Sequence, residues 1–337
     1  MIGIGVIGCG HWGPNHIRNL SSVAGAKVLA AADPDQRRRA SIERMFPEVK
    51  AVADHRAILE DARIHAVVVA TPSSTHHALV KEALASGRDV LCEKPLATST
   101  AEAKELAELA KQHSRILMVG HTFLFNPGIL KLKSLLDDEV AGKTYYMHAV
   151  RTNLGPIRSD VNVVMDLASH DISIYNFLRG AMPTTVSARG GRFLRSGIDD
   201  VAFITLTYPG NVIGSIMVSW LHPHKVRQVT VVGDRKMIVW DDLGQMGPLM
   251  IFDKTVAREA HYADFGEFHL LAREGDVTIP RVNLAEPMKL EAEHFVACLK
   301  DRSRPRTPAE QGVEVARVLD AIGRSMSANG APVEVEA

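Results

Sequence analysis

The stretch GIGVIGCGHWGPNHIRNL, residues 3–20, carries the pattern that decides the fold. An apolar run at Ile2–Ile7 leads directly into a G-x-G-x-x-G motif, and a helical pattern follows the last glycine. In this position the glycines allow a tight turn and let the backbone approach a diphosphate. The N-terminus of the following helix adds N–H donors and a favourable dipole. The stretch therefore predicts a dinucleotide site formed by Gly8, Cys9, Gly10, His11, Trp12 and Gly13.

The acidic residue that ends the next predicted strand supports this interpretation. Asp33 closes the run KVLAAAD and lies 20 residues after Gly13. A carboxylate there can accept hydrogen bonds from the adenosine ribose hydroxyls and repels a 2′-phosphate, which favours NAD. NADP stays open because Arg38, within Arg37-Arg38-Arg39, could bind that phosphate, although a solvated helix face also explains the run. The alternative for the whole motif is that its glycines only turn the chain and Asp33 only caps a helix.

Residues 1–120 alternate between short apolar runs and helical segments, which predicts βαβ units and a parallel sheet covered on both faces. We therefore expect an α/β fold class with an N-terminal Rossmann domain at 1–120. The expected strands are Ile2–Ile7, Val28–Ala32, Ala66–Ala70, Asp89–Cys92 and Ile116–Val119. The expected helices are Asn15–Ser21, Asp35–Met45, Thr75–Ser86 and Thr100–His113.

The pattern changes after residue 120. A helix near Pro127 and another at about 162–179 precede long β-rich runs, which YPGN and GDRK separate as turn signals. This predicts an α+β domain over 121–337 with a large, mostly antiparallel open sheet. Two closing helices within 286–327 could pack on either domain.

The composition excludes several classes of protein. The chain has 337 residues and equal numbers of basic and acidic side chains, 39 of each, whereas a general nucleic-acid binder needs a basic surplus. No apolar run reaches the length of about 18 residues that predicts a membrane span. The three cysteines are far apart and the 15 histidines form no metal-binding motif, so we expect no metal and a reduced, cytoplasmic protein.

Three stretches resemble the Gfo/Idh/MocA oxidoreductases: GVIGCGHWG, VVVATPSSTHHALVKEALASGRDVLCEKPLA and MDLASHD. The resemblance implies a Rossmann domain, a second domain whose open sheet often forms homodimers or homotetramers, and hydride transfer between nicotinamide and a sugar carbon bearing a secondary hydroxyl. HWGPNHIRNL, NLG and MDLASHDISI further resemble members that act on nucleotide-linked amino sugars, among them UDP-N-acetylglucosamine 3-dehydrogenases.

The resemblance also assigns roles to individual residues. Lys94 in CEKPL matches the family lysine beside the nicotinamide and the reacting hydroxyl, while Asp166 and His170 match the family's Asp and His. Many members carry another acid three residues after that histidine, where this chain has Ser173 and instead places Asp171 directly after it. The cofactor loop and the motif around the lysine are matched by Thr71, Pro72, Ser73, His76 and Glu93.

These residue types suit alcohol oxidation, which needs a base for the hydroxyl proton and stabilisation of the developing alkoxide. His170 can serve as the base and Lys94 as the positive charge. On an α-helix Asp166 would share the face of His170 and could orient its imidazole or bind a sugar hydroxyl, whereas Asp171 would not. The alternative is that Asp166 and His170 form an ordinary surface pair.

Candidate substrate contacts are His121, Arg151, Asn153, Arg158, Lys225 and Arg227, of which the basic residues could meet a pyrophosphate or simply be solvated. The basic residues do not by themselves establish a nucleotide moiety. The resemblance implies a dehydrogenase acting on a sugar ring hydroxyl, with C3 of UDP-N-acetylglucosamine as the leading candidate. Two alternatives stay open: a dehydrogenase or reductase of a free sugar, inositol or keto sugar, and a non-catalytic NAD-binding sensor.

Overall fold

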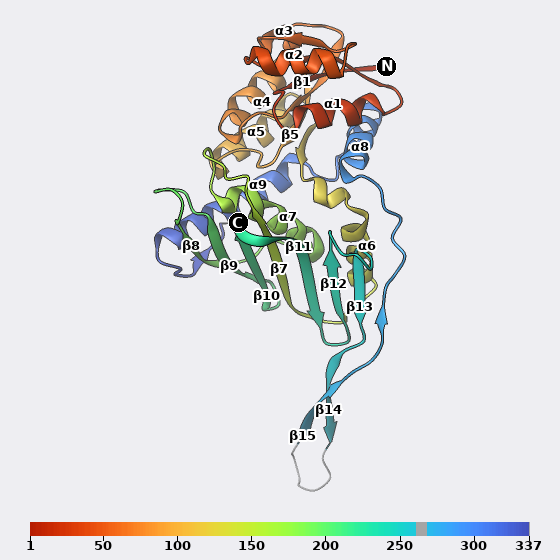
Figure 1. Cartoon of the computed structure of the whole chain (residues 1–337), viewed down its shortest axis with the longest axis vertical. Coiled ribbons are helices and arrows are strands. Elements are labelled where there is room, and N and C mark those ends of the chain that lie inside the picture. The colour runs from red at the N-terminus through yellow and green to blue at the C-terminus, as the bar shows by residue number, and fades with distance from the viewer. Residues whose placement is uncertain (261–267, 337) are drawn as a thin grey trace. The chain divides into compact units, whose positions relative to one another are not determined.

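The computed structural model describes residues 1–260 and 268–336, which form two compact units (Figure 1). The first unit comprises Met1–Phe125 and Ala285–Asp320, and the second comprises Asn126–Leu284 and Ala321–Ala337. In the described part of the chain, no helix combines the length and apolarity needed to cross a membrane. Nor do three or more His, Cys, Asp or Glu side chains in those residues form a group that could hold a metal ion.

A six-stranded parallel sheet forms the centre of the first unit, as the alternating pattern predicts. Its strand order is β3-β2-β1-β4-β5-β6, so the order reverses between β1 and β4. In such sheets ligands bind beyond the carboxyl ends of the strands at the reversal. The strands are β1 (Ile2–Ile7), β2 (Ala26–Ala32), β3 (Lys50–Val52), β4 (Ile64–Val69), β5 (Asp89–Glu93) and β6 (Leu117–Gly120).

Helices cover both faces of this sheet, because its strands are apolar on both sides. Val67 and Val69 of β4 pack into one buried cluster, while Ala66 and Val68 pack into the other. The first cluster includes residues of α3 (Arg56–Leu59), α4 (His76–Ala85), α5 (Thr100–Gln112) and α9 (Ala309–Ser327). The second includes residues of α1 (Gly13–Ser21), α2 (Gln36–Met45) and α8 (Pro287–Asp301).

The closing helices, which the sequence could not assign to a domain, contribute to the first unit. Phe295 and Val296 of α8 and Val313 of α9 are buried in the two clusters of the Rossmann sheet. Arg302, directly after α8, donates two hydrogen bonds to the carboxylate of Asp89 at the start of β5, at 2.6 and 3.1 Å.

A nine-stranded mixed sheet forms the second unit, in the order β16-β13-β12-β11-β7-β10-β9-β8-β17. It is mostly antiparallel, as expected, but β10 runs parallel to β7, a central strand that the sequence analysis did not predict. The strands are β7 (Thr144–Leu154), β8 (Thr185–Gly191), β9 (Val201–Tyr208), β10 (Val212–Ser219), β11 (Leu221–Gly233), β12 (Met237–Asp241), β13 (Leu249–Phe252), β16 (Val277–Thr278) and β17 (Val333–Glu334); β14 (Thr255–Ala260) and β15 (Phe268–Arg273) form a separate hairpin.

Two helices of the second unit lie against this sheet, namely α6 (Pro127–Asp137) and α7 (Ser169–Arg179). Two buried tyrosines fix α7 to its strands. The Tyr175 hydroxyl donates to the carbonyl oxygen of Ser215 in β10 at 2.9 Å, and the Tyr208 hydroxyl of β9 donates to Asn176 Oδ1 at 2.9 Å.

The helix predicted at 162–179 is not a uniform α-helix. Residues Val164–Ala168 form a π-helix, η3, and only from Ser169 does α7 follow. The N–H of Ser169 donates to the carbonyl of Val164, five residues back. The α-helical period that placed Asp166 and His170 on one face therefore does not hold at Asp166, because a π-turn holds more residues than an α-turn.

Candidate active site

The glycine loop joins β1 to α1 where the strand order of the Rossmann sheet reverses. Gly8 has a φ of +100°, and a Cβ there would meet the carbonyl oxygen of Ala70 at 2.5 Å. A Cβ at Gly13 would lie 2.1 Å from the carbonyl oxygen of Gly8. At Gly10 the nearest described atom would be Arg38 Nη1, at 3.8 Å. The fold itself requires Gly8 and Gly13, whereas the open space at Gly10 fits the close approach of a dinucleotide.

Two glycine substitutions should separate these roles. Gly10→Ala is expected to leave the thermal midpoint of unfolding nearly unchanged and to weaken NAD binding by about tenfold, or ~1.4 kcal/mol. Gly13→Ala is expected to lower the midpoint as well, because its methyl group would press on the backbone of Gly8. Calorimetry and a fluorescence titration with NAD measure the two quantities. Unchanged NAD affinity in Gly10→Ala would contradict the assignment of the loop.

The Asp33 carboxylate, which is 3% exposed, is held by the backbone around it. It accepts the N–H of Cys9 and the N–H of Asp35, each at 2.9 Å, and Arg38 Nη1 lies 3.4 Å away. Burial, and then the charge of Asp33, raise the pKa of the Cys9 thiol to about 12, so the thiol stays protonated at neutral pH. Cys9 thus contributes its backbone, and Asp33 is fixed where a ribose contact is expected.

Two residues at the tip of the glycine loop are open to solvent. His11 and Trp12 contact each other edge to face, with ring centroids 4.9 Å apart, and Trp12 is 45% exposed. The sequence predicts both residues as part of the dinucleotide site. Their exposure argues against core packing and leaves both side chains accessible to a ligand.

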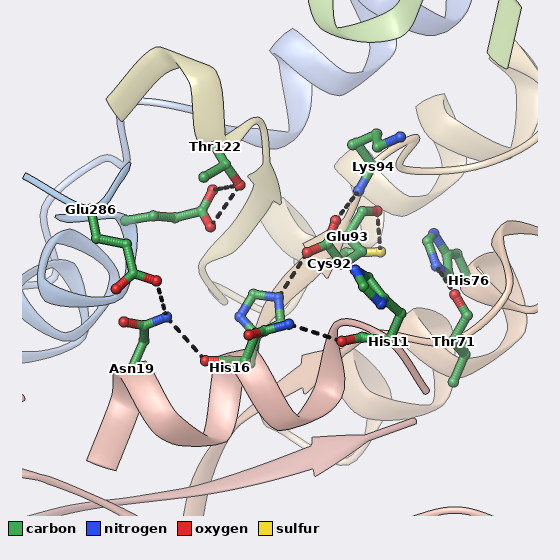
Figure 2. Close-up of polar contacts among 12 residues, drawn as sticks. His11, His16, Asn19, Thr71, His76, Cys92, Glu93, Lys94, Thr122 and Glu286 are labelled. Carbon is green, nitrogen blue, oxygen red and sulfur yellow. Dashed lines mark hydrogen bonds and ion pairs between the residues drawn. The ribbon is translucent and has the colours of Figure 1, made fainter. Parts of the chain in front are cut away.

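Lys94 directly follows β5 and lies at the same sheet edge as the glycine loop, because parallel strands share their carboxyl edge. The buried side chain of His76 connects the loop that contains Lys94 to the loop that follows β4. His76 Nδ1 lies 2.8 Å from the carbonyl oxygen of Pro95. His76 Nε2 lies 3.0 Å from the carbonyl oxygen of Thr71, and both of these residues are labelled in Figure 2. Of the other expected residues of this loop, Ser73 is buried and Pro72 is exposed.

A cluster of polar residues lies next to Lys94 in the first unit and consists of His16, Glu93, Thr122 and Glu291. Glu93 Oε1 is 2.8 Å from His16 Nε2, and Glu93 Oε2 accepts the backbone N–H of Lys94 at 3.2 Å (Figure 2). Nearby, the Thr122 hydroxyl donates to Glu291, whose carboxyl group is fully buried. Burial, and then the charge of Glu93, raise the pKa of Glu291 well above its usual range, which favours its neutral form.

His121 follows β6 in the same unit and is 1% exposed. Neither of its ring nitrogens has a hydrogen-bond partner among the described residues. Burial, and then the positive charge of Lys94, lower its pKa to about 4. The expected substrate contact is therefore a neutral, enclosed imidazole that could hydrogen-bond to a bound molecule or water.

The depressed pKa of His121 predicts a specific loss of stability in acid. Its folded-state pKa of about 4 lies below the unfolded value of 6.5, so the unfolded chain binds the proton first. The free energy of unfolding should therefore fall as pH drops from 6.5 to 4, by up to about 3 kcal/mol from this group. Urea unfolding at several pH values should show a shallower decline in His121→Asn. Equal declines in both proteins would refute the prediction.

In the second unit, two donors hold the Asp166 carboxylate. Arg158 Nη1 lies 3.3 Å from Oδ1, and the indole N–H of Trp220 donates to Oδ2 at 3.1 Å. Arg158 also donates to Asp160, at 2.9 and 2.6 Å. From the sequence, Arg158 could meet a pyrophosphate or be solvated; in the structure its charge faces two carboxylates. The structure thus makes Arg158 and Trp220 partners of Asp166.

His170 is the second residue of α7, in the first turn after the π-helix. Ser173, at the position where many Gfo/Idh/MocA members carry an acid, donates its hydroxyl to the carbonyl oxygen of His170 at 2.7 Å. Ser173 is almost fully buried, so it supports the backbone of the helix start.

Arg151 corrects another expectation from the sequence. Its guanidinium is buried and donates to both carboxylate oxygens of Asp171, at 2.9 and 2.8 Å. A buried bidentate pair of this kind fixes the sheet to the helix, so its charge is already balanced and is not presented to a substrate pyrophosphate. Asp171 is structural, as its place on the helix predicted.

The remaining expected substrate contacts differ in accessibility. Asn153 donates to the carbonyl oxygen of Gly155 at 2.5 Å, and Arg227 pairs with Asp242 at 3.0 Å. Lys225 is exposed on β11. Lys225 is thus the most accessible of the basic candidates.

His16, Glu291 and Trp220 were missed by the sequence analysis, although a signal existed for the first two. His16 lies on the buried face of α1 with Gly13, Ile17 and Leu20, and Glu291 lies on that of α8 with Met288, Ala292 and Phe295. A polar residue at a core position of the helical period indicates a buried polar partner. Trp220 gave no such signal, because its neighbours in sequence are strand residues.

Comparison with protein families matches both parts of the chain. Residues 2–121 match the model of an oxidoreductase family with an NAD-binding Rossmann fold, and residues 129–239 match the GFO/IDH/MocA C-terminal domain. Together the two models cover more than half of the chain, which therefore belongs to the Gfo/Idh/MocA family of NAD-dependent oxidoreductases. The expectations of a Rossmann fold, an oxidoreductase class and NAD are confirmed at this level.

Named relatives include inositol dehydrogenases. The chain is 34% identical to inositol 2-dehydrogenase 2 of Saccharopolyspora erythraea over 62% of its own length and 64% of the relative's, so the match spans less than two thirds of that protein. It is 28% identical to a scyllo-inositol 2-dehydrogenase (NAD(+)) of Bacillus subtilis over 98% of this chain and 95% of the relative. The fold matches a levoglucosan dehydrogenase solved with NADH and levoglucosan, with a TM-score of 0.84 and 19% identity over all of both chains.

Proposed function

We propose that the protein is an NAD-dependent dehydrogenase of a secondary ring hydroxyl in a cyclitol or free sugar. The observation that carries the proposal is the glycine loop at Gly8–Gly13 together with Lys94, both at the carboxyl edge of one parallel sheet. The similarity to proteins named as inositol 2-dehydrogenases supports the substrate class. Bound NAD would supply the hydride acceptor, held by the glycine loop and Asp33.

Each proposed catalytic residue has a distinct chemical task. His170 takes the hydroxyl proton as general base, and the ammonium of Lys94 stabilises the negative charge that develops on the oxygen. Asp166, held by Arg158 and Trp220, binds a substrate hydroxyl or orients the base.

A nucleotide sugar, with C3 of UDP-N-acetylglucosamine as the reacting centre, is the second candidate. It derives from the sequence resemblance of HWGPNHIRNL and MDLASHDISI. Acidic partners of Arg151, Arg158 and Arg227 argue against it, because these three guanidiniums are already balanced by carboxylates. An uncharged cyclitol or sugar needs no such basic groups.

A substrate screen tests the proposal. The purified protein is mixed with NAD or NADP and with myo-inositol, scyllo-inositol, common free sugars or UDP-N-acetylglucosamine, and NADH absorbance is followed. Turnover is expected with a cyclitol or free sugar and NAD. Turnover with UDP-N-acetylglucosamine alone would overturn the substrate assignment. NAD binding without any turnover would favour a sensor. Light scattering tests the homodimer or homotetramer that the family resemblance implies.

A further inference from the structure

We propose that His16 and Glu93 act as a positioning pair, which ties the Lys94 loop to helix α1 and thereby sets the place of the Lys94 side chain. This inference rests on the proposed function, because it assigns the pair's effect to Lys94. Neither residue touches the reacting atoms in this proposal. They act through the backbone of the lysine.

The geometry gives the Glu93 carboxylate two different partners. Its Oε1 faces His16 Nε2 from α1 at 2.8 Å, and its Oε2 accepts the N–H of Lys94 at 3.2 Å. His16 is 1% exposed and Glu93 is 7% exposed. Figure 2 shows Glu93 between the imidazole and the Lys94 backbone, with the Lys94 side chain directed away from the pair.

The glycine at position 120 of β6 leaves space for the Glu93 carboxylate. A Cβ at Gly120 would lie 3.3 Å from Glu93 Oε2 and 3.2 Å from Glu93 Cα. Any side chain at this position would therefore crowd Glu93. Gly120 therefore gives Glu93 the space in which it reaches both of its partners.

The negative charge of Glu93 strengthens its contacts with His16 and Lys94. Although burial raises the pKa of Glu93, the hydrogen bond and charge of His16 and the charges of Lys94 and His76 outweigh it and hold the pKa below its usual value. Burial, and then the charge of Glu93, raise the pKa of Glu291, the other carboxyl group of the cluster, well above its usual value. These opposite shifts favour the charged form of Glu93 over that of Glu291, and a buried anion strongly favours the arrangement that keeps its partners in place.

The pair joins two parts of the proposed cofactor site that lie far apart in sequence. His16 is in the first turns of α1, whose N-terminus follows the glycine loop, and Lys94 follows β5. A cofactor diphosphate bound at the N-terminus of α1 and the side chain of Lys94 would then both be held in place through the contact between His16 and Glu93. A shift of about 1 Å in a catalytic group can cost about 10²-fold in rate, so loss of the pair should slow the chemical step.

Substitutions in the full-length enzyme test this inference. His16→Phe and Glu93→Ala are each expected to lower kcat by about tenfold or more, with smaller changes in KM and in the dissociation constant of NAD. His16→Gln keeps an N–H donor and should recover most of the kcat lost in His16→Phe. A larger primary deuterium isotope effect in the impaired variants would show that hydride transfer itself has slowed.

The decisive measurement uses a Lys94→Ala background. If the pair acts through Lys94, His16→Phe and Glu93→Ala should lower kcat no further there. The matched control is His55 and Glu82, an equally close pair at 2.8 Å in the same unit, whose replacement by glutamine should leave kcat unchanged. Additional losses in the Lys94→Ala background, or full kcat in both pair variants, would overturn the inference. If Lys94→Ala itself keeps full activity, the proposed function fails instead.

Discussion

Lys94→Ala is expected to lower kcat by about 10³-fold, or ~4 kcal/mol in activation free energy, while NAD affinity stays within about twofold. The substitution removes the positive charge that stabilises the developing alkoxide. Lys94 is 9% exposed, so its charge acts with less screening by water than a surface charge. Steady-state turnover with the substrate found in the screen and a fluorescence titration with NAD measure the two effects.

Two comparison variants sharpen this test. Lys94→Arg keeps the charge but replaces a compact ammonium by a planar fork, so it should recover only part of the activity. Lys104→Ala removes an exposed lysine from α5 and should leave kcat unchanged. A Lys94→Ala enzyme within about threefold of the unchanged protein would exclude the assigned electrostatic role, since such roles are worth about 10²-fold or more.

His170→Asn is the second large effect, with an expected loss in kcat of about 10²-fold to 10⁴-fold. Asparagine keeps the polarity and approximate size but cannot accept the hydroxyl proton. The rate of the unchanged enzyme should fall toward acid as the base becomes protonated, and the variant should lack this decline. Turnover measured from pH 5 to pH 9 in both proteins gives the profiles.

The control for this variant is His113→Asn, an exposed histidine at the end of α5. It should show the activity and pH profile of the unchanged protein. If His170→Asn keeps full activity with the same acid decline, another group is the base, and His170 has no part in proton transfer.

Much of the first unit could be predicted because its signals are local. The glycine motif and the alternating apolar runs gave five of the six strands within a few residues, and four helices. The strand Lys50–Val52 and the helix Arg56–Leu59 were missed, since three or four residues are too few to show a period. The residues of the glycine loop and Asp33 were found for the same reason, as they sit at the ends of strongly patterned elements.

The second unit was less predictable. Strand β7 pairs with β10 and β11, more than 60 residues away, and its half-buried sequence does not alternate cleanly. The π-turn at Val164–Ala168 has no sequence period of its own, so Asp166 was placed as if on an α-helix. Arg151 and Arg158 looked like free cations, because their acidic partners Asp171 and Asp160 cannot be recognised from spacing alone.

The sequence by itself determined the Rossmann class, the dinucleotide loop and the residue types at the proposed site, because turn chemistry and apolar period act over a few neighbouring residues. Only the tertiary structure decided which charges face each other. It paired Glu93 with His16, 77 residues away, and formed the buried ion pair between Arg151 and Asp171. The physical reason is that a buried charge needs a partner, and the partner is chosen by how strands and helices pack rather than by distance along the chain.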